Sequence, residues 1–275
     1  MPDMNTSSTW RMPTLLRASA ALHVGAAVLV AARPHAWPWA LGGVFANHLQ
    51  LAAVGLWPRS HALGSNWTSL PAASAARGEV AITIDDGPHP EVTPAVLEVL
   101  ARHEARATFF CIGKRAERYP QCVREALAAG HAIENHSYRH AHHFSLLGPG
   151  SMRREIEHAQ RALHAVCGIP PTFFRAPAGL RNPFLDPVLH RLELQLASWT
   201  RRGFDTVNAD AATVLARLTR DLRGGDILLL HDGHAARDVG GRPVILQVLP
   251  RLLQYLRDRG LTTVTLGDAR RPAPL

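Results

Sequence analysis

Lysine is almost missing from this chain of 275 residues, because Lys114 is the only lysine among its 30 basic side chains. The arginines that supply the remaining basic charge are scattered, and no run of Lys and Arg is longer than two residues. The formal net charge of +8 is compatible with nucleic acid or an anionic membrane as a partner. Nucleic-acid-binding surfaces concentrate their basic residues in a patch or stripe, so the sequence predicts no nucleic-acid partner.

Cysteine and charged residues are also scarce. The three cysteines, Cys111, Cys122 and Cys167, are odd in number and lack the spacing of a zinc site, which excludes a disulfide scaffold. Charged residues make up 19% of the chain and apolar residues 47%, so wholesale disorder is excluded as well. The length allows one large domain, or one domain with an appendage. Histidine is in excess, with 16 copies, and it is the commonest metal ligand and a proton carrier near neutral pH.

Residues 1–61 form a hydrophobic segment that differs from the rest of the chain. No charged residue occurs in residues 18–32 or in residues 34–58, and Arg33 alone separates the two stretches. The second stretch is long enough to cross a hydrocarbon core of about 30 Å as a helix, and three tryptophans lie near its ends, where interfacial aromatics belong. We therefore predict that this segment is helical and transmembrane, and that it attaches the chain to a bacterial inner membrane.

Two other interpretations of this segment stay open at the level of sequence. The first stretch, preceded by Arg11 and Arg17, resembles the apolar part of a signal peptide, and the second would then be irregular. Alternatively, His23, His48 and the interior prolines are compatible with a buried helical pair in a soluble protein. Arginines flank the stretches on all sides, so the sequence does not determine which side of the membrane the remaining chain occupies.

The rest of the chain divides into a short linker and one domain. Residues 62–78 are small and polar without periodicity, which predicts a linker. From residue 79 to residue 269, β-rich runs alternate with helical patterns. The predicted strands cover residues 79–84, 107–112, 131–134, 171–175, 194–199, 226–230 and 262–266. The predicted helices cover residues 93–103, 119–129, 151–166, 183–192, 211–222 and 244–259. This alternation predicts an α/β domain whose mostly parallel sheet closes, or nearly closes, into a barrel.

Polar side chains follow the predicted strands at the points where the strands end. These side chains are Asp85 and Asp86 after the first strand, Asn135 and His136 after the third, Arg175 at the end of the fourth, Asp205 shortly after the fifth, and His231 and Asp232 after the sixth. In a parallel barrel such positions converge on the rim at the carboxyl ends of the strands, where active sites form. A purely structural plan gives no reason for five loops to bring such groups to one mouth, so we predict an active site there.

Two of these motifs together indicate a metal site. Taken alone, Asp85-Asp86-Gly-Pro would more often be a turn, and a His-x-x-x-His pair arises easily by chance in a chain with 16 histidines. If residues 136–140 turn helically, however, His136 and His140 can reach one ion. With Asp86 they would form a facial site of two imidazoles and one carboxylate that leaves positions open for water and substrate.

The other polar residues indicate acid–base chemistry. Arg175 either satisfies carbonyl groups at the rim or forms an ion pair that holds a neighbouring carboxylate ionised and in place. His231 is either a satisfied rim histidine or the partner of Asp205. In the second case the carboxylate would orient the imidazole and raise its pKa, so that the protonated ring can donate to a leaving group.

The motifs, in this order and spacing, resemble the polysaccharide deacetylase family, also known as the NodB-homology domain or carbohydrate esterase family 4. The resemblance covers Glu79 to about Ala269 and rests on Thr83-Ile-Asp-Asp-Gly-Pro88, His136-Ser-Tyr-Arg-His140, Arg175-Ala-Pro177 and Leu228-Leu-Leu-His231. Ala107-Thr-Phe-Phe110 with Gly113 matches the usual second strand of the family. The resemblance implies a distorted (β/α) barrel for residues 79–269.

The resemblance also implies a role for each matching residue. It assigns Asp86, His136 and His140 to a divalent metal, with Zn²⁺ first and Co²⁺, Ni²⁺ or Mn²⁺ as alternatives. It makes Asp85 the general base with Arg175 as its partner, and His231 the general acid with Asp205 as the residue that orients it.

Two positions depart from the family pattern. Ala178 stands where the family usually has an aromatic residue after Arg-x-Pro, and Thr206 stands where a tryptophan usually follows the Asp of the fourth motif. Both positions normally shape the pocket for the acyl group and the sugar, so the glycan and the size of the acyl group are left undetermined. We expect Trp199, Phe204 and Pro177 to contact the substrate.

The resulting hypothesis is a membrane-attached, metal-dependent hydrolase that removes N-acetyl groups from N-acetylated amino sugars of a polysaccharide, oligosaccharide or cell-envelope glycan. Its expected partners are that glycan and, through the N-terminal segment, membrane lipid. The alternatives are a deacylase of a lipid-linked sugar and a catalytically silent carbohydrate-binding protein. A binding protein has no use for an acid and a base together, so the complete set of residues favours an enzyme.

Overall fold

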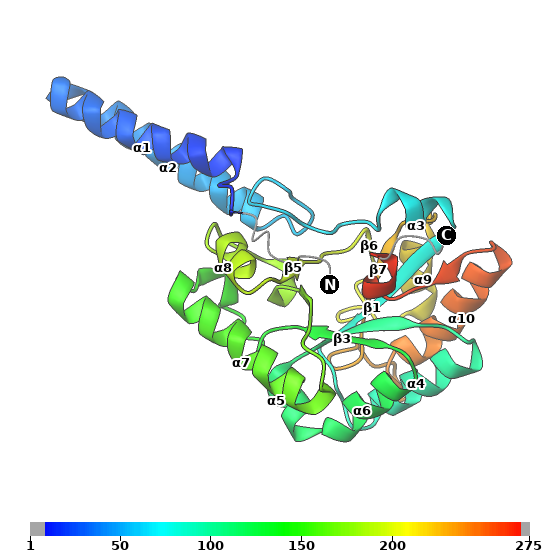
Figure 1. Cartoon of the computed structure of the whole chain (residues 1–275). Helices are drawn as coiled ribbons and strands as arrows, with labels where there is room; N and C mark the ends of the chain where they lie inside the picture. The colour runs from blue at the N-terminus through cyan, green and yellow to red at the C-terminus, as the bar shows by residue number, and fades with distance from the viewer. Residues whose placement is uncertain (1–8, 271–275) are drawn as a thin grey trace.

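The domain that follows the N-terminal segment is built on a parallel sheet that curls into a half-barrel (Figure 1). The computed structural model describes residues 9–270. The strands are β1 (Glu79–Asp85), β2 (Ala107–Cys111), β3 (Ala132–Asn135), β4 (Phe173–Phe174), β5 (Gln195–Leu196), β6 (Arg201–Arg202), β7 (Ile227–His231) and β8 (Thr262–Thr263). Their order in the sheet is β5-β4-β3-β2-β1-β7-β6, and β8 pairs with the first residues of β1 before β2 begins its pairing. The sheet is therefore a half-barrel that stays open between β5 and β6, in agreement with the predicted distorted (β/α) barrel.

Helices cover the outer face of this sheet (Figure 1). They are α4 (Val92–Arg102), α5 (Gly113–Arg118), α6 (Pro120–Ala128), α7 (Pro149–Cys167), α8 (Leu185–Arg191), α9 (Ala211–Thr219) and α10 (Ile245–Asp258). Two short helices, α3 (Ala72–Ala76) and α11 (Leu266–Ala269), lie instead at the amino ends of the strands, where Leu266 and Ala269 pack on the inner side of the sheet. Short 3₁₀ turns occupy Phe144–Leu146 and Pro177–Gly179. Strands covered in this way are buried on both faces, which is why β1 and β7 read as continuous apolar runs in the sequence.

The alternation of side chains along β1 and β7 decides what enters the mouth of the half-barrel. Ile82, Ile84 and the even-numbered leucines of β7 pack in the core cluster with the outer helices. Ala81 and Leu229 belong instead to a second apolar cluster on the inner side of the sheet. Because successive side chains point to opposite faces, the last residues of these strands, Asp85 and His231, face inward. The register places these two residues directly opposite each other.

The structure differs from the predicted elements at two places near the site. A short strand, β6, was not predicted, because its two residues are arginines and carry no apolar signal. Residues 62–78, predicted as a linker, pack along the sheet: Leu63 and Leu70 are buried, and Trp67 forms a bridge to Ala197 next to β5. The small residues of this segment allow it to pack closely against the domain. The segment also contains helix α3, which its small and polar composition did not predict.

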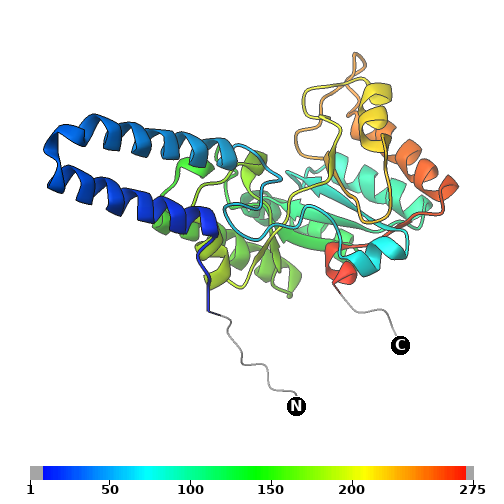
Figure 2. The same ribbon diagram turned by 90° about the horizontal axis from the view of Figure 1, so that it is seen from above.

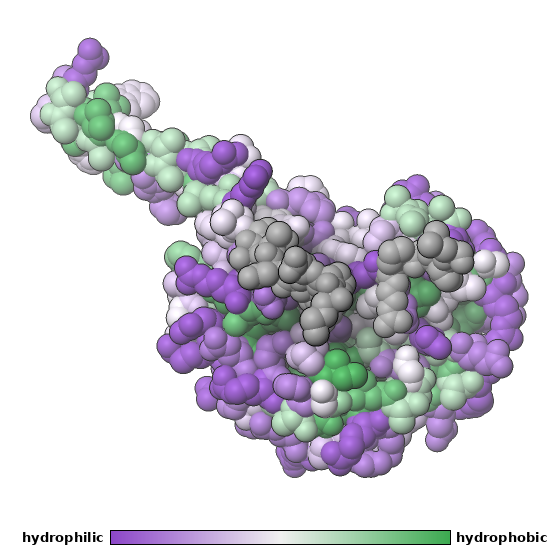
Figure 3. Space-filling model, viewed as in Figure 1, coloured by the Kyte–Doolittle hydropathy of each residue, from purple (hydrophilic) through white to green (hydrophobic). Residues whose placement is uncertain are grey.

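The N-terminal segment forms a helical hairpin that projects away from the domain (Figures 1 and 2). Helix α1 (Thr14–Ala32) and helix α2 (Trp37–Gly55) are joined by a 3₁₀ turn at Pro34–Ala36. Residues 34–55 are thus helical and not irregular. Most side chains of the pair are exposed, and Figure 3 shows apolar residues over much of the hairpin, so the pair is not buried against the described part of this chain. Within residues 9–270, α1 is the one helix that is both long and apolar enough to cross a membrane.

The root of the hairpin is fixed to the domain beside the mouth of the half-barrel. The backbone N–H of Arg181 donates to the carbonyl of Gly55 at 3.1 Å. A side chain at Gly55 would collide with the Arg181 carbonyl, so this close approach requires glycine. Just beyond α2, the carbonyl of Pro58 accepts hydrogen bonds from Ser198 Oγ at 2.7 Å and from Asn66 Nδ2 at 2.9 Å.

Candidate active site

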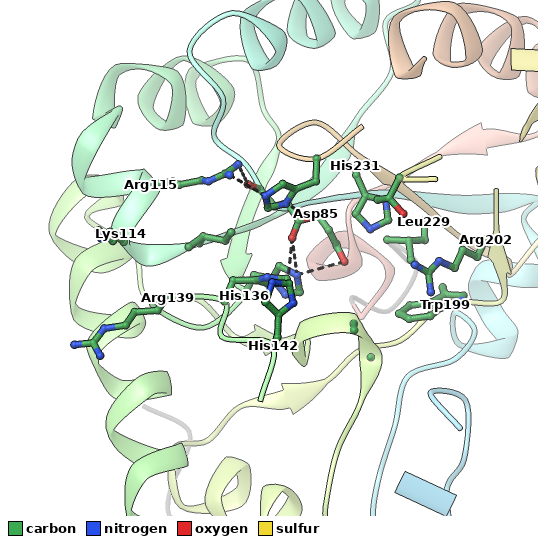
Figure 4. A pocket seen from close by; sticks show the side chains of 17 residues that line it. Asp85, Lys114, Arg115, His136, Arg139, His142, Trp199, Arg202, Leu229 and His231 are labelled. Atoms are coloured by element: carbon green, nitrogen blue, oxygen red, sulfur yellow. Dashed lines mark hydrogen bonds and ion pairs between the residues drawn. The ribbon is translucent and has the colours of Figure 1, made fainter. Parts of the chain in front are cut away.

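The predicted polar residues meet at one cavity of about 500 Å³ at the carboxyl ends of the strands. Its lining includes Asp85, Asp86, His136, His140 and His231, which come from the carboxyl ends of three strands, β1, β3 and β7. Figure 4 shows Asp85 and His136 facing the same space, with His231 on the other side of it. These side chains, which are distant in the sequence, therefore meet at one end of the barrel, as the predicted fold requires.

Asp85 is held by a buried arginine. Arg175 Nη1 donates to Asp85 Oδ1 at 2.7 Å and to Thr83 Oγ1 at 2.8 Å. The other two nitrogens of this guanidinium group also donate: Nε to the carbonyl of Ala197 at 3.1 Å and Nη2 to the carbonyl of Ser198 at 2.7 Å. Both partners of the ion pair are buried, and loss of one partner of such a pair typically costs about 3–5 kcal/mol. The guanidinium thus compensates the Asp85 charge and leaves its second oxygen, Oδ2, on the cavity side.

Three side chains form a candidate metal centre. Asp86 Oδ1 lies 3.3 Å from His136 Nε2 and 3.2 Å from His140 Nε2, and the three ligand atoms lie within 4.8 Å of one another. His136 Nδ1 donates to the carbonyl of Arg175 at 2.8 Å, which leaves Nε2 free to bind a cation. Asp86 Oδ1 is buried and has no hydrogen-bond partner. The donor set and this unpartnered oxygen fit a divalent cation.

The charges of these ligands suit that interpretation. Burial alone would raise the pKa of the Asp86 carboxyl, but the neighbouring imidazoles of His136 and His234 outweigh burial and hold the pKa well below its ordinary value. Burial lowers the pKa of His140 to about 4, and His136 adds to this effect. Burial also acts to lower the pKa of His136, but Asp85 and Asp86 outweigh it and raise that pKa. A proton and a cation therefore compete for the same nitrogen of His136.

The loop that carries the two histidines is not helical, contrary to the condition set by the sequence pattern. Ser137 and His140 have positive φ values of 63° and 54°. Asn135 Oδ1 accepts the N–H of Ser137 at 2.8 Å, and Ser137 Oγ accepts the N–H of His140 at 3.0 Å. Asp86 also has a positive φ, of 72°. Left-handed backbone at non-glycine residues costs free energy, and here it occurs where the side chains must converge.

The candidate acid is held on the opposite side of the cavity. His231 Nδ1 donates to Asp205 Oδ1 at 2.8 Å, and the backbone N–H of His231 donates to Asp205 Oδ2 at 2.7 Å. Burial lowers the pKa of His231, but the charge and the hydrogen bond of Asp205 outweigh it and raise the pKa above its ordinary value. Because Nδ1 is engaged by Asp205, Nε2 is the nitrogen that faces the cavity.

The sequence did not single out His234 or Arg115, which both contact Asp86. His234 Nδ1 lies 2.9 Å from Asp86 Oδ2, and Arg115 Nη1 donates to the carbonyl of Asp86 at 2.7 Å. Arg115 Nη2 lies 3.1 Å from His234 Nε2. The spacing His231-x-x-His234 was the available signal, but only the fold shows that the second histidine turns back to the first strand.

The three residues expected to contact substrate have different positions. Trp199 lines the catalytic cavity. Phe204 is half-exposed and lines a neighbouring groove instead. Pro177 is buried and lines neither hollow; its ring begins the 3₁₀ turn that presents Ala178. Ala178 and Thr206 line the cavity, so the two departures from the family pattern lie where substrate would bind.

Comparisons with known proteins agree with this geometry. Residues 72–197 match the family model for polysaccharide deacetylases. A chitooligosaccharide deacetylase of Azorhizobium caulinodans is 37% identical over 191 residues, which cover 67% of this chain and 90% of the relative. A peptidoglycan-N-acetylglucosamine deacetylase of Bacillus cereus is 31% identical over 194 residues, which cover 70% of this chain and 88% of the relative.

A solved structure gives the same result for the fold. The family 4 carbohydrate esterase of Streptomyces lividans, determined in complex with acetate, superposes with a TM-score of 0.63 at 32% identity, covering 72% of this chain and 98% of that one. The match spans the half-barrel and nearly all of the relative. This chain therefore belongs to the polysaccharide deacetylase family and is a hydrolase of the carbohydrate deacetylase type.

Proposed function

We propose that this chain is a membrane-attached, divalent-metal-dependent hydrolase that removes the N-acetyl group from an amino sugar of a cell-envelope glycan. One observation carries the proposal. The carboxylate Asp85 and the imidazole His231 line the same cavity as the Asp86, His136 and His140 triad. This arrangement supplies a base, an acid and a cation site around one point, as amide hydrolysis requires.

The cation in this proposal is Zn²⁺. Two imidazoles and one carboxylate are a common catalytic zinc set, and such a set leaves a coordination position for water or substrate. When bound, the metal supplies Lewis acidity that polarises the acyl carbonyl and lowers the pKa of water. Asp86, His136 and His140 would hold it.

The protein's own groups divide the proton transfers. Asp85 Oδ2 accepts a proton from the attacking water, while Arg175 keeps Oδ1 occupied and the carboxylate oriented. The resulting adduct collapses when His231 Nε2 donates a proton to the sugar nitrogen, which leaves as an amine. Asp205 stabilises the protonated ring before this transfer. The products are acetate and the free amino sugar, and acetate is the ligand of the Streptomyces lividans relative.

Removal of the metal should abolish the reaction. We expect the full chain to release acetate from an N-acetylglucosamine oligomer, and dialysis against a chelator to reduce the rate by at least about a hundredfold, because the carbonyl loses its Lewis acid. Acetate release before dialysis, after dialysis and after addition of Zn²⁺ is the measurement. Unchanged turnover in a chain whose metal content has fallen to zero would contradict metal dependence.

The hairpin is the proposed membrane attachment. Each of its helices has 19 residues, which gives a length of about 28 Å and matches the hydrocarbon core. Two polar side chains of α2 contact α1: Asn47 Nδ2 donates to Ser19 Oγ at 2.8 Å, and His48 Nε2 lies 3.3 Å from His23 Nε2. Polar groups paired between helices leave apolar side chains toward lipid.

A charge on the hairpin should release the chain from membranes. Val28 is 62% exposed on α1, and Val28→Arg places a charge there that costs about 3 kcal/mol at a bilayer centre. We expect a smaller fraction of this variant to resist an alkaline carbonate wash of the membrane pellet. Val239→Arg, at a fully exposed position of the domain, is the matched control and should stay with the membrane. Equal retention of the two variants would contradict insertion of α1.

A further inference from the structure

A second hollow, of about 950 Å³, adjoins the catalytic cavity. The two share Ala178, Trp199 and Arg202, so they meet at the rim of the half-barrel. We call the second hollow the arginine groove, because five arginines and no carboxylate line it. The arginines are Arg59, Arg201, Arg202, Arg217 and Arg220.

Three of these arginines have no carboxylate partner in the described chain. Arg201 pairs with Asp226 at 2.6 Å, and Arg220 lies 3.9 Å from Asp221. By contrast, the recorded hydrogen bonds of Arg59 and Arg217 go only to the carbonyls of Thr200 and Gly203.

Arg202 is the unpaired arginine shared with the catalytic cavity. Its guanidinium stacks on Trp199 and Phe204, with 5.5 and 4.9 Å from Cζ to the ring centroids, and its Nε is buried without a partner. Together with Arg59 and Arg217 it gives the groove a positive charge that no carboxylate in residues 9–270 neutralises. Guanidinium groups bind phosphate through paired N–H donors, so a phosphate is the anion that this cluster fits.

The two ends of the groove differ in character. The inner end adjoins the catalytic cavity at Ala178, which lines both hollows and has only a methyl side chain. The outer end is formed by Leu56 and Trp57, which follow α2 at the root of the hairpin and are 64% and 60% exposed. If the hairpin enters a bilayer, this outer end lies at the membrane surface, where an exposed tryptophan is expected.

We propose that the arginine groove binds the phosphate of a lipid-linked N-acetylated sugar, which is the substrate of the neighbouring site. The sugar occupies the catalytic cavity, and the phosphate lies among Arg59, Arg202 and Arg217. The lipid chain extends past Leu56 and Trp57 into the bilayer. This assignment rests on the proposed deacetylase function. The reaction remains amide hydrolysis: water is consumed, acetate and an amine are formed, and the phosphate linkage stays intact.

The test compares two substrates that carry the same sugar. The full chain, loaded with Zn²⁺ in detergent, is assayed with N-acetylglucosaminyl diphosphopolyprenol and with uncharged chitotriose. In Arg59→Gln/Arg217→Gln, the ratio of kcat/KM for the lipid substrate to kcat/KM for chitotriose should fall about tenfold or more, because two charge-assisted contacts are lost. Arg124→Gln, on the exposed side of α6, is the matched control and should leave both rates unchanged. An unchanged ratio in the double variant would overturn the proposal.

A binding measurement separates this proposal from the deacetylase assignment. The detergent-solubilised chain is titrated with polyprenyl phosphate and, separately, with soluble N-acetylglucosamine 1-phosphate. Tighter binding of the lipid phosphate than of the soluble phosphate, weakened about tenfold in the double variant, supports the groove as a phosphate site. This holds even if no acetate is released from either substrate, a result that would contradict only the deacetylase assignment. Equal affinity for the soluble phosphate would overturn the lipid part, and equal affinity of wild type and double variant for the lipid would overturn the site.

Discussion

Asp85→Asn should lower the turnover number about a thousandfold while the protein keeps its metal and its fold. The amide retains the shape of the carboxyl group, and its Oδ1 can still accept the hydrogen bond that Arg175 Nη1 gives at 2.7 Å. An amide cannot accept a proton from water, however, and the loss of a general base typically costs about 10²–10⁴ in rate. The substitution therefore removes the proposed chemistry of Asp85 with little change in packing.

The measurement pairs acetate release with bound zinc per chain. Asp86, His136 and His140 are unaltered in the variant, so we expect one metal per chain in both proteins. Asp258→Asn, on the exposed end of α10, is the matched carboxylate control and should keep wild-type turnover. If the variant loses its metal together with its turnover, Asp85 is a metal ligand and not the base. If the variant keeps wild-type turnover, Asp85 has no role in the reaction.

Asp85 could be predicted from the sequence because the information that positions it is local. Asp85 is the last residue of a buried strand, so the alternation of side chains along β1 points it into the barrel. The same argument predicted His231 at the end of β7, which the register places opposite Asp85. Where a strand determines the direction of a side chain, the pattern of apolar residues was sufficient to predict that the side chain lies at the site.

Residues whose positions depend on loops could not be predicted in this way. His234 reaches Asp86 because the chain reverses after β7, and Pro177 is buried because its turn folds inward. Phe204 has a positive φ of 60°, which directs it to the arginine groove and away from the catalytic cavity. No periodicity in the sequence encodes such turns, so aromatic character alone did not indicate which of the two hollows a side chain lines.

The arginine groove shows the same limit on a larger scale. Its walls come from the root of the hairpin, the segment after β5 and helix α9, which are distant in sequence. In the sequence the arginines are scattered and indicate no binding surface. The fold gathers five of them at one place, so the absence of basic runs excluded a polyelectrolyte stripe but could not exclude a compact anion site.

Asp205→Asn should lower turnover about a hundredfold to ten-thousandfold and move the alkaline limb of the pH–rate profile to lower pH. Asp205 accepts two N–H groups, from the ring and from the backbone of His231, and an asparagine offers only one oxygen for them. Whichever way the amide turns, an N–H donor of asparagine faces an N–H of His231. Loss of a similarly placed carboxylate costs about 10⁴ in rate in the serine proteases.

The direction of the pH shift follows from the causes of the His231 pKa. Burial lowers this pKa and Asp205 raises it, and the resulting pKa lies above the ordinary value for histidine. The protonated ring is the active form of a general acid, so activity is present at low pH and is lost as the pH rises through the pKa. Without the carboxylate, burial acts with less opposition, the pKa falls, and the loss begins at lower pH. A bound cation acts on both proteins alike, so the comparison isolates Asp205.

The experiment is a kcat profile across pH 5–9 for the wild type and for Asp205→Asn, with zinc content and thermal midpoint measured in parallel. Because Asp205 is fully buried, a purely structural role would lower the thermal midpoint but leave the position of the alkaline limb unchanged. A limb that moves toward lower pH in a folded, metal-loaded variant identifies His231 as the group that titrates. A limb that stays in place would assign the titration, and with it the acid, to another residue.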